Sequence, residues 1–368
     1  MNLDGLRIAL VGPLPPPEGG MANQTQQLGE LLRREGAQVT VIRVNAPYRP
    51  AFVGKLRGMR AVFRLVPYVA RLWQVGSRVD VYHVMANSGW SWHLFAAPAV
   101  WIARLRGVPV VVNYRGGEAE SFLRRSSVSL RATLHRASLL AVPSGFLEQV
   151  FGSWGIESDV VPNIVDTERF RPAAAPSDET RPRLVVARNL ERIYDIDTAL
   201  RAFAIILRHL PGATLAVAGS GPEEPHLRSL AEELGVAHAV EFRGRLDRDA
   251  MAELYRSASV VLNPSRVDNM PNSVLEAMAS GAPLVTTNVG GIPYIVRDGV
   301  TALLVAAGDH VGMAAAARRV LSDPRLADRL RAAALTDVQQ YTWARIRERW
   351  SDVYRSVLPS TTTQARGA

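Results

Sequence analysis

The chain has 368 residues, of which 48% are hydrophobic and 21% charged, and a formal net charge of +9. This composition excludes a disordered chain, and the length is too great for one ordinary core, so two domains are expected. There is no cysteine, which excludes disulfides, thiolate metal sites and cysteine nucleophiles. Because there is no signal-peptide pattern, nor any run near the ~18 apolar residues of a spanning helix, we expect a cytoplasmic protein.

Short β-branched runs alternate with helical segments in the first half of the chain. A strand at 6–14 precedes a proline-rich loop and a helix at 23–36, and a further helix is expected at 92–107. The other expected strands are 37–44, 80–85, 109–116, 139–144 and 159–165. This alternation predicts a parallel sheet covered by helices on both faces.

The segment from Gly36 to Val79 is basic and contains no acidic residue. Its cations are interleaved with apolar and aromatic side chains, a pattern typical of an amphipathic helix suited to anionic lipid headgroups. A solvated helix face explains the pattern equally well, and no nucleic-acid recognition motif is present. The basic residues are Arg43, Arg49, Lys55, Arg57, Arg60, Arg64, Arg71 and Arg78.

Composition changes at 166–183, where proline, alanine and charged residues are frequent, as in a linker. The alternation then restarts, with expected strands at 184–190, 214–221, 239–246, 259–265, 283–289 and 302–309. We therefore expect a first domain over 1–170, a second over 171–342, and an amphipathic helix with a flexible end over 343–368. Open parallel sheets bind ligands at the carboxyl ends of their strands, so the site is expected between the two halves.

The stretch SRVDNMPNSVLEAMASG, residues 265–281, joins a polar loop to the start of a helix. Free amides and the positive dipole end at a helix start favour a phosphate. Asp268 precedes the helix and Glu276 lies within it, so two acids flank the phosphate position and could hold a sugar and a ribose. Ser273 and Glu276 also form a Ser-x-x-Glu capping box, which is the alternative interpretation.

Six pieces of the chain occur in a characteristic order: the Gly19-Gly20 loop, VPNIVDTERF, VAGSGPEEPHLRSLAEELG, VEFRGRL, PSRVDNMPNSVLEAMASGAPLVTTNVGG and VRDGVTALLV. Over nearly the whole chain they resemble the family 4 glycosyltransferases, retaining enzymes of the GT-B fold. The resemblance implies an α/β fold in which two Rossmann-like domains face each other across a cleft. A C-terminal helix is expected to cross back to the first domain.

The resemblance also implies the reaction and its partners. A sugar would pass from a nucleotide sugar, UDP-sugar before GDP-sugar, to an acceptor hydroxyl, with no metal or other cofactor. The first domain of such enzymes receives the acceptor, and here that domain carries the basic 36–79 segment. We therefore expect a lipid-linked glycan acceptor, as in envelope polysaccharide assembly, and a peripheral position on an anionic membrane surface.

In the resembling family, two acids eight positions apart frame the donor site. Asp268 takes the position that contacts the sugar, where glutamate is usual, and Glu276 takes the ribose position. The residues between them that match the loop at the diphosphate and sugar are Asn269, Met270, Pro271, Asn272 and Ser273.

The family also carries an arginine and a lysine that neutralise the leaving diphosphate. Arg188 matches the arginine, but Tyr194 stands at the approximate place of the lysine. Arg192 is the candidate substitute, because a guanidinium binds phosphate in bidentate fashion.

Two further candidates lie in the first half. Glycines let a backbone approach a ligand closely, so the Gly19-Gly20 loop is expected to face the donor, although a tight turn is an alternative. Arg115 stands where many family members have a histidine facing the sugar, and could donate to a phosphate or a sugar hydroxyl. An ion pair with Glu118 or Glu120 is its alternative role.

Some patterns are set aside, and three other functions were weighed. Asp195-Ile-Asp197 and Asp247-Arg-Asp249 match a metal-binding pattern but lie at expected helix starts, where aspartates cap helices. A sugar-nucleotide epimerase of related fold is one alternative. A catalytically weakened nucleotide-sugar-binding subunit is another, because three positions depart from the family pattern. A phosphorylase is excluded, since its essential lysine would have to be Lys55, in the wrong segment.

Overall fold

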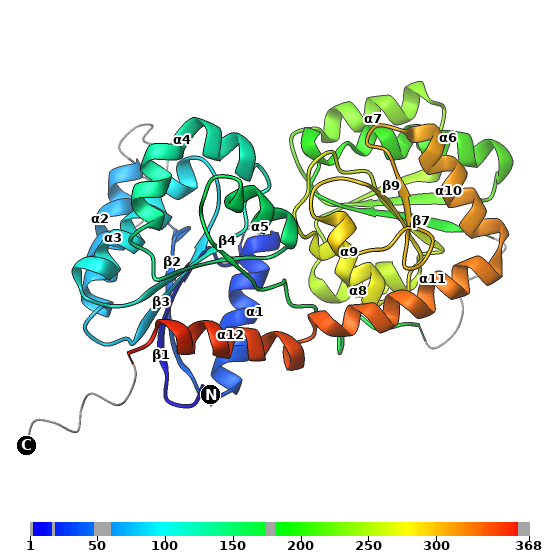
Figure 1. Cartoon of the computed structure of the whole chain (residues 1–368). Helices are drawn as coiled ribbons and strands as arrows, with labels where there is room; N and C mark the ends of the chain where they lie inside the picture. The colour runs from blue at the N-terminus through cyan, green and yellow to red at the C-terminus, as the bar shows by residue number, and fades with distance from the viewer. Residues whose placement is uncertain (1–2, 17–18, 48–59, 174–180, 360–368) are drawn as a thin grey trace, which may run out of the picture. The chain divides into compact units, whose positions relative to one another are not determined.

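The computed structural model describes residues 3–16, 19–47, 60–173 and 181–359. The chain forms two compact units: unit 1 comprises Met1–Pro162 with Ile346–Ala368, and unit 2 comprises Asn163–Arg345. Each unit has its own parallel sheet with helices packed on it (Figure 1). Residues 48–59 of the basic segment, which include Arg49, Lys55 and Arg57, lie outside the described residues.

The sheet of unit 1 has the strand order β2-β1-β3-β4-β5-β6 within the described residues, and every pairing is parallel. All side chains of β3 and β4 are buried, as expected for strands covered on both faces. Strands β2 and β3 lie on opposite sides of β1, so the chain crosses from one side of β1 to the other after β2. This crossing makes a topological switch point. The strands are β1 Arg7–Gly12, β2 Gln38–Arg43, β3 Val81–Ala86, β4 Val110–Tyr114, β5 Leu139–Val142 and β6 Asp159–Val160.

The helices of unit 1 are α1 Gly20–Arg34, α2 Arg60–Val75, α3 Ala97–Leu105, α4 Ala119–Leu134, α5 Gly145–Gly152 and α12 Trp343–Val357. The helix expected at 92–107 is divided into a π-helical turn, Trp92–Ala96, and α3. Pro98 explains the division, because it lacks the N–H that would continue a regular ladder across this point.

The last helix packs into the core of unit 1. Trp350 and Tyr354 of α12 are fully buried, and the Trp350 ring centroid lies 4.5 Å from that of His83 on β3. Arg349 adds a hydrogen bond of 3.1 Å from its Nη1 to the carbonyl oxygen of Val160 at the end of β6. α12 is therefore an integral part of unit 1 although it is remote in sequence.

The sheet of unit 2 has the order β12-β11-β10-β7-β8-β9 within the described residues, again all parallel. Its switch point lies between the adjacent strands β7 and β10, which is where such sheets bind ligands. The strands are β7 Arg183–Ala187, β8 Thr214–Ala218, β9 Val240–Gly244, β10 Val260–Asn263, β11 Leu284–Thr287 and β12 Leu303–Val305.

Aspartates begin three of the helices in unit 2. The side chains of Asp247, Asp309 and Asp323 accept backbone N–H groups at the starts of α8, α10 and α11. The helices are α6 Ile196–His209, α7 Glu224–Glu233, α8 Arg248–Arg256, α9 Asn272–Ala279, α10 His310–Ser322 and α11 Pro324–Asp337. Short 3-10 turns are η3 Arg192–Tyr194, η4 Ala237–Ala239, η5 Ile292–Tyr294 and η6 Val338–Tyr341. In the part of the chain that the structure describes, no helix is long and apolar enough to cross a membrane.

Candidate functional site

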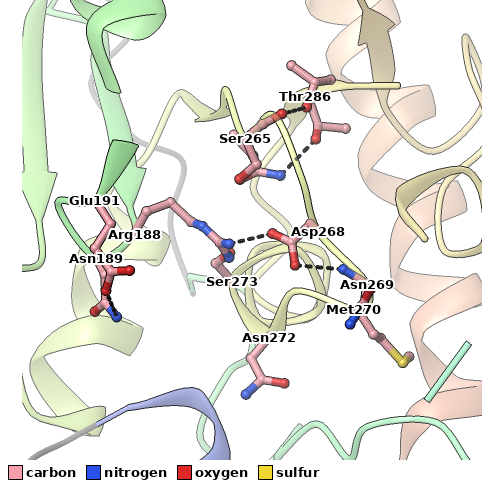
Figure 2. A network of polar contacts seen from close by, with 12 residues as sticks. Arg188, Asn189, Glu191, Ser265, Asp268, Asn269, Met270, Asn272, Ser273 and Thr286 are labelled. Atoms are coloured by element: carbon pink, nitrogen blue, oxygen red, sulfur yellow. Dashed lines mark hydrogen bonds and ion pairs between the residues drawn. The ribbon is translucent and has the colours of Figure 1, made fainter. Parts of the chain in front are cut away.

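Arg188 lies at the carboxyl end of β7 and is the centre of a buried polar cluster at the switch point of unit 2 (Figure 2). Its Nη2 forms an ion pair with Oδ2 of Asp268, and its Nη1 donates to Oγ of Ser273 at 3.1 Å. The guanidinium also lies over the Tyr194 ring, 4.0 Å from the centroid. The side chains of Arg188 and Asp268 are only 10% and 12% exposed, so the loop before α9, the start of α9 and the turn η3 hold this cation in place.

One donor of Arg188 remains available. Its Nε is buried and has no hydrogen-bond partner among the described residues. A buried guanidinium N–H without an acceptor is energetically costly unless a ligand oxygen completes it. The cluster is therefore suited to an anion such as a phosphate.

The start of α9 differs from the capping-box interpretation. Pro271 is the N-cap residue, with φ −66° and ψ 122°, and no side chain caps the helix. Ser273 is already the second helical residue, and its Oγ accepts from Arg188. The capping box is therefore wrong. Because the first backbone N–H groups of a helix have no intrahelical acceptor, the amides of this turn can meet an anion.

Polar side chains anchor the loop before α9. Asn163 donates from Nδ2 to the carbonyl oxygen of Met270 and to Oδ1 of Asn272, both at 2.8 Å. The Asn269 N–H donates to Oδ1 of Asp268 at 3.0 Å, which fixes the carboxylate against its own loop. The loop thus presents a defined backbone next to Arg188.

Buried hydroxyl and amide groups fix the exit from β10. Asn263 donates from Nδ2 to Oγ1 of Thr286 at 2.9 Å, and Ser265 donates from Oγ to Oδ1 of Asn263 at 3.0 Å (Figure 2). Thr287 adds a hydrogen bond of 2.6 Å from its Oγ1 to the carbonyl oxygen of Ser265. These contacts join β10 to β11 and set the direction in which the loop leaves the sheet.

A glycine pair that sequence reasoning left without a role supports Asp268. The Gly291 N–H donates to the carbonyl oxygen of Asp268 at 2.9 Å. A Cβ at Gly290 would lie 2.0 Å from that same oxygen, and one at Gly291 would lie 1.6 Å from the carbonyl oxygen of Asn269. Only glycines allow this approach, so the loop after β11 positions the loop that carries Asp268.

A second glycine pair supports Arg188 in the same way. A Cβ at Gly219 would lie 1.9 Å from the carbonyl oxygen of Arg188, and one at Gly221 would lie 2.2 Å from that of Leu190. The Gly-Ser-Gly segment at 219–221 is therefore a backbone packing element. The tight spacing of such glycine pairs, once after β8 and once after β11, was the sequence signal available for both.

Glu276 lies on α9, one turn beyond Asn272, and its electrostatic environment is unusual. Burial among protein atoms raises the pKa of Glu276 to about 7, although Arg248, the Tyr255 hydroxyl and Arg188 act in the opposite direction. Part of the side chain still reaches the surface. Glu276 is therefore placed to change its charge near neutral pH.

Asp268 is also affected by burial. Burial raises the pKa of the Asp268 carboxyl above its ordinary value, and the Arg188 charge and the Asn269 N–H oppose this shift. Because the carboxylate faces a guanidinium in the same cluster, the ion pair is the form that we infer at neutral pH.

Arg192 is not part of this cluster. It lies exposed on η3, and no ion pair or hydrogen bond of its guanidinium is found among the described residues. Tyr194, two residues later, contributes its ring to Arg188 instead. The position expected to hold a lysine therefore supplies an aromatic face rather than a second cation.

Gly19, Gly20 and Arg115 lie in unit 1. Gly19 is the N-cap of α1, with φ 178°, an extended backbone that any residue adopts, and a Cβ there would meet nothing within 4 Å. Packing among the described residues therefore does not require glycine at this position. Arg115 follows β4 and donates from Nε to Oδ1 of Asn113 at 3.2 Å.

The environment of Arg115 is low in polarity. Burial alone lowers the pKa of Arg115 to about 10. Of its two expected carboxylate partners, Glu120 forms its ion pair with Arg124 at 2.8 Å. Arg115 thus remains a cation at neutral pH, in a setting where its charge acts strongly on neighbouring groups.

The four aspartates of the two Asp-x-Asp patterns have structural contacts. Asp195 accepts from Thr198 and Arg266, at 2.9 and 2.8 Å, and Asp197 pairs with His226 at 2.7 Å. Asp247 caps α8, and Asp249 pairs with Arg169 at 3.0 Å. Within the described ranges, no group of three or more histidine and acidic side chains is arranged to hold a metal ion.

Comparison with known proteins identifies the family. The family described as Glycosyltransferase Family 4 matches residues 18–169, and Glycosyl transferases group 1 matches residues 167–337. The glycogen synthase of Mycobacterium tuberculosis is 31% identical over 291 residues, which are 75% of this chain and 69% of that protein. The chain belongs to family 4 of the glycosyltransferases.

Solved structures of other proteins have a fold similar to that of this glycosyltransferase. The sucrose-phosphate synthase of Thermosynechococcus elongatus has a TM-score of 0.77 at 22% identity, covering 95% of this chain and 98% of that one. Anabaena HepE in complex with UDP-glucose has a TM-score of 0.72 at 16% identity, covering 95% and 99%. The predicted fold, two Rossmann-like domains of the GT-B type, is confirmed.

Proposed function

We propose that this glycosyltransferase transfers a sugar from UDP, with retention of configuration, to a hydroxyl of a lipid-linked glycan. The observation that carries the donor half is the Arg188 cluster at the start of α9, which offers a buried donor without an acceptor beside a helix start that no side chain caps. Two such groups favour a diphosphate over a neutral ligand. UDP is the nucleotide of choice because HepE, of similar fold, binds UDP-glucose.

The donor residues that lie in or beside this cluster are assigned the following roles. Arg188 and the first amides of α9 bind the diphosphate, and the Glu276 carboxylate accepts hydrogen bonds from the ribose hydroxyls. Asp268 and Asn269, held by Gly290 and Gly291, meet the transferred sugar.

The proposed chemistry is a front-face displacement. The acceptor hydroxyl attacks the anomeric carbon on the side from which the diphosphate leaves, and a leaving phosphate oxygen takes the hydroxyl proton. Arg188 stabilises the charge that develops on the phosphate, and the protein otherwise positions the reactants. A preorganised donor of this kind contributes about 3–4 kcal/mol to the transition state. Arg115, a buried cation of unit 1, is proposed to contact a phosphate or sugar hydroxyl.

The acceptor half of the proposal rests on the surface of unit 1. Phe63, Val66 and Trp73 are exposed along one side of α2, at separations of three and seven residues. Leu105 is exposed at the end of α3, against which α2 packs, and Arg106 lies over the Trp73 ring at 4.9 Å. An exposed apolar stripe with arginines beside it is what an interfacial helix presents to lipid.

Charge complementarity supports an anionic membrane as the partner of this surface. From Gly36 to Gly117 the only acidic residue is Asp80, and it is already paired with Arg7 at 2.5 Å. The span holds eleven basic residues against this one acid, including Arg115 of the proposed site; they are Arg43, Arg49, Lys55, Arg57, Arg60, Arg64, Arg71, Arg78, Arg104, Arg106 and Arg115. An enzyme held at such a surface meets lipid-linked acceptors such as polyprenyl-diphosphate sugars, and we propose this as the acceptor class.

The test combines a panel of nucleotide sugars with membrane-extracted lipid-linked acceptors. We expect free UDP and a glycosylated lipid in equal amounts, with an α-linked product from an α-linked donor. An altered nucleotide sugar formed without acceptor would instead indicate an epimerase. Tight UDP binding without turnover on any acceptor would indicate a binding subunit.

A further inference from the structure

Three polar side chains lie in the otherwise apolar centre of unit 1. His83 on β3 and Asn113 on β4 are fully buried, and so is Tyr354 of α12. The strands that carry His83 and Asn113 are adjacent in the sheet. Buried polar groups are costly unless they are hydrogen-bonded, so their arrangement needs an explanation.

The contacts connect these groups into one chain that ends at Arg115. Nδ1 of His83 lies 2.8 Å from the Tyr354 hydroxyl, and Nε2 of His83 lies 3.0 Å from Nδ2 of Asn113. Oδ1 of Asn113 accepts from Nε of Arg115 at 3.2 Å. The order is therefore α12, β3, β4 and then the residue that follows β4.

The direction of each hydrogen bond follows from the chemistry of Arg115. A guanidinium can only donate, so the atom of Asn113 that faces it must be the amide oxygen. The amide NH₂ then faces His83 and must donate, so Nε2 of His83 carries no proton. The proton of the neutral ring is on Nδ1, which donates to Tyr354.

The protonation state of His83 agrees with this assignment. Burial, reinforced by the Arg115 charge, lowers the pKa of His83 to about 3, so the ring stays neutral and Nε2 remains an acceptor. Among the described residues, the titratable and charged groups that face the ring are Tyr354 and Arg115. Trp350 of α12 packs on the ring and adds no charge.

We propose that His83 and Asn113 are positioning residues that hold the plane of the Arg115 guanidinium. Arg115 is also tied at its backbone, where its N–H donates to the carbonyl oxygen of Ala86 at the end of β3 at 2.9 Å. With both backbone and Nε held, rotation of the guanidinium is restricted. This inference rests on the proposed role of Arg115 in transfer.

The consequence is a link between the last helix of the chain and a candidate site residue. Tyr354 and His83 are 271 positions apart in sequence, so the contact exists only when α12 is docked. An apolar core at these positions would pack equally well, but it would leave Asn113 free to rotate away from Arg115.

Two substitutions of one residue test the proposal. In His83→Gln the amide reaches the position of Nε2 and can still accept from Asn113, whereas in His83→Asn the shorter amide reaches only the position of Nδ1. Both remove the ring, so loss of packing is matched between them. We expect His83→Asn to lower kcat about tenfold or more, with the KM for the donor and the Tm close to those of His83→Gln. His83→Gln is expected to stay within about threefold of the native kcat.

A second measurement separates this proposal from the proposed function. The ¹⁵Nε–H resonance of Arg115, assigned by its absence in Arg115→Lys, is expected to exchange slowly with solvent in the native chain and in His83→Gln, and at least about tenfold faster in His83→Asn. This result requires no turnover, so it stands even if no transfer is found. Equal exchange and equal kcat in the two His83 variants would overturn the proposal.

Discussion

The two arginines at the ends of β7 and β4 are buried by different means. Arg188 faces a carboxylate, a hydroxyl and an aromatic ring, whereas Arg115 is held at Nε by a neutral amide. Burial lowers the pKa of Arg115 to about 10. The comparison teaches that a carboxylate compensates the cation in unit 2, while in unit 1 a neutral amide orients the cation at its Nε.

The largest effect is expected at Arg188. Substitution Arg188→Gln is expected to reduce kcat by about 10²–10³, because a preorganised cation is lost where negative charge develops. Exposed Arg192, four residues later, is the matched control, and Arg192→Gln should change kcat by less than about threefold. Steady-state rates of UDP release measure both.

Stability must be separated from catalysis in this variant. Removing one partner of a buried pair leaves Asp268 uncompensated, so Arg188→Gln alone is expected to lower the Tm. The double variant Arg188→Gln/Asp268→Asn should recover the Tm but not kcat. If the double variant regains native kcat, Arg188 serves the fold and not the reaction.

A smaller effect, about 10- to 100-fold, is expected on UDP affinity when Glu276 becomes Gln, because hydrogen bonds to a charged group are lost. In the native chain the UDP affinity should rise about tenfold from pH 6 to pH 8, since Glu276 ionises with a pKa of about 7. Titration calorimetry at both pH values measures this, and Glu276→Gln should remove the part of the change that is due to the carboxyl.

The same pKa predicts the sign of a stability change. The folded-state pKa of Glu276 is raised above the unfolded value, so the folded chain binds more protons between about pH 4.5 and pH 7. The stability contribution of this carboxyl therefore falls as pH rises through that window. A Tm that falls no faster in the native chain than in Glu276→Gln would contradict the raised pKa.

The surface of unit 1 offers a milder test of the contrast between the units. Each arginine near an anionic leaflet contributes about 1 kcal/mol, so Arg71→Gln should weaken binding to anionic vesicles about fivefold at low salt. Arg201 is an exposed arginine on α6 of unit 2, so Arg201→Gln is the matched control and should leave binding unchanged. Co-sedimentation at two salt concentrations measures this, and no binding of the native chain at low salt would exclude the membrane proposal.

Much of the fold was accessible from sequence, because buried parallel strands are continuous β-branched runs that end in loops. The sequence patterns at 184–190 and 259–265 located β7 and β10, and so the positions of Arg188 and Asp268. The ion pair between Arg188 and Asp268 could not be predicted from the sequence. It depends on two loops 80 positions apart and on the adjacency of β7 and β10 at the switch point.

The remaining details depended on backbone geometry that no local pattern encodes. Ser273 matched a capping box, yet the helix begins earlier because Pro271 takes the N-cap position. Gly290 and Gly291 lie in the loop after β11 and contact the loop after β10, so only the folded chain brings them to Asp268. His83 looked like one of seven unrelated histidines, because its partners come from β4 and α12.

The smallest expected effect is that of a chelator, and it tests whether the cluster of unit 2 alone supplies the positive charge that the diphosphate needs. The buried Arg188 and the first amides of α9 are already converging donors, and the aspartates of both Asp-x-Asp patterns are engaged in caps and ion pairs. We therefore expect kcat in excess EDTA to stay within about twofold of its native value, because no donor of the site is removed. The same test is more sensitive in the Arg188→Gln variant. A metal ion that also stabilised the diphosphate charge would become more important once Arg188 is absent. A loss of activity in EDTA that Mg²⁺ or Mn²⁺ restores would show that the diphosphate needs a metal besides Arg188, and the contrast between the two units would then have to include it.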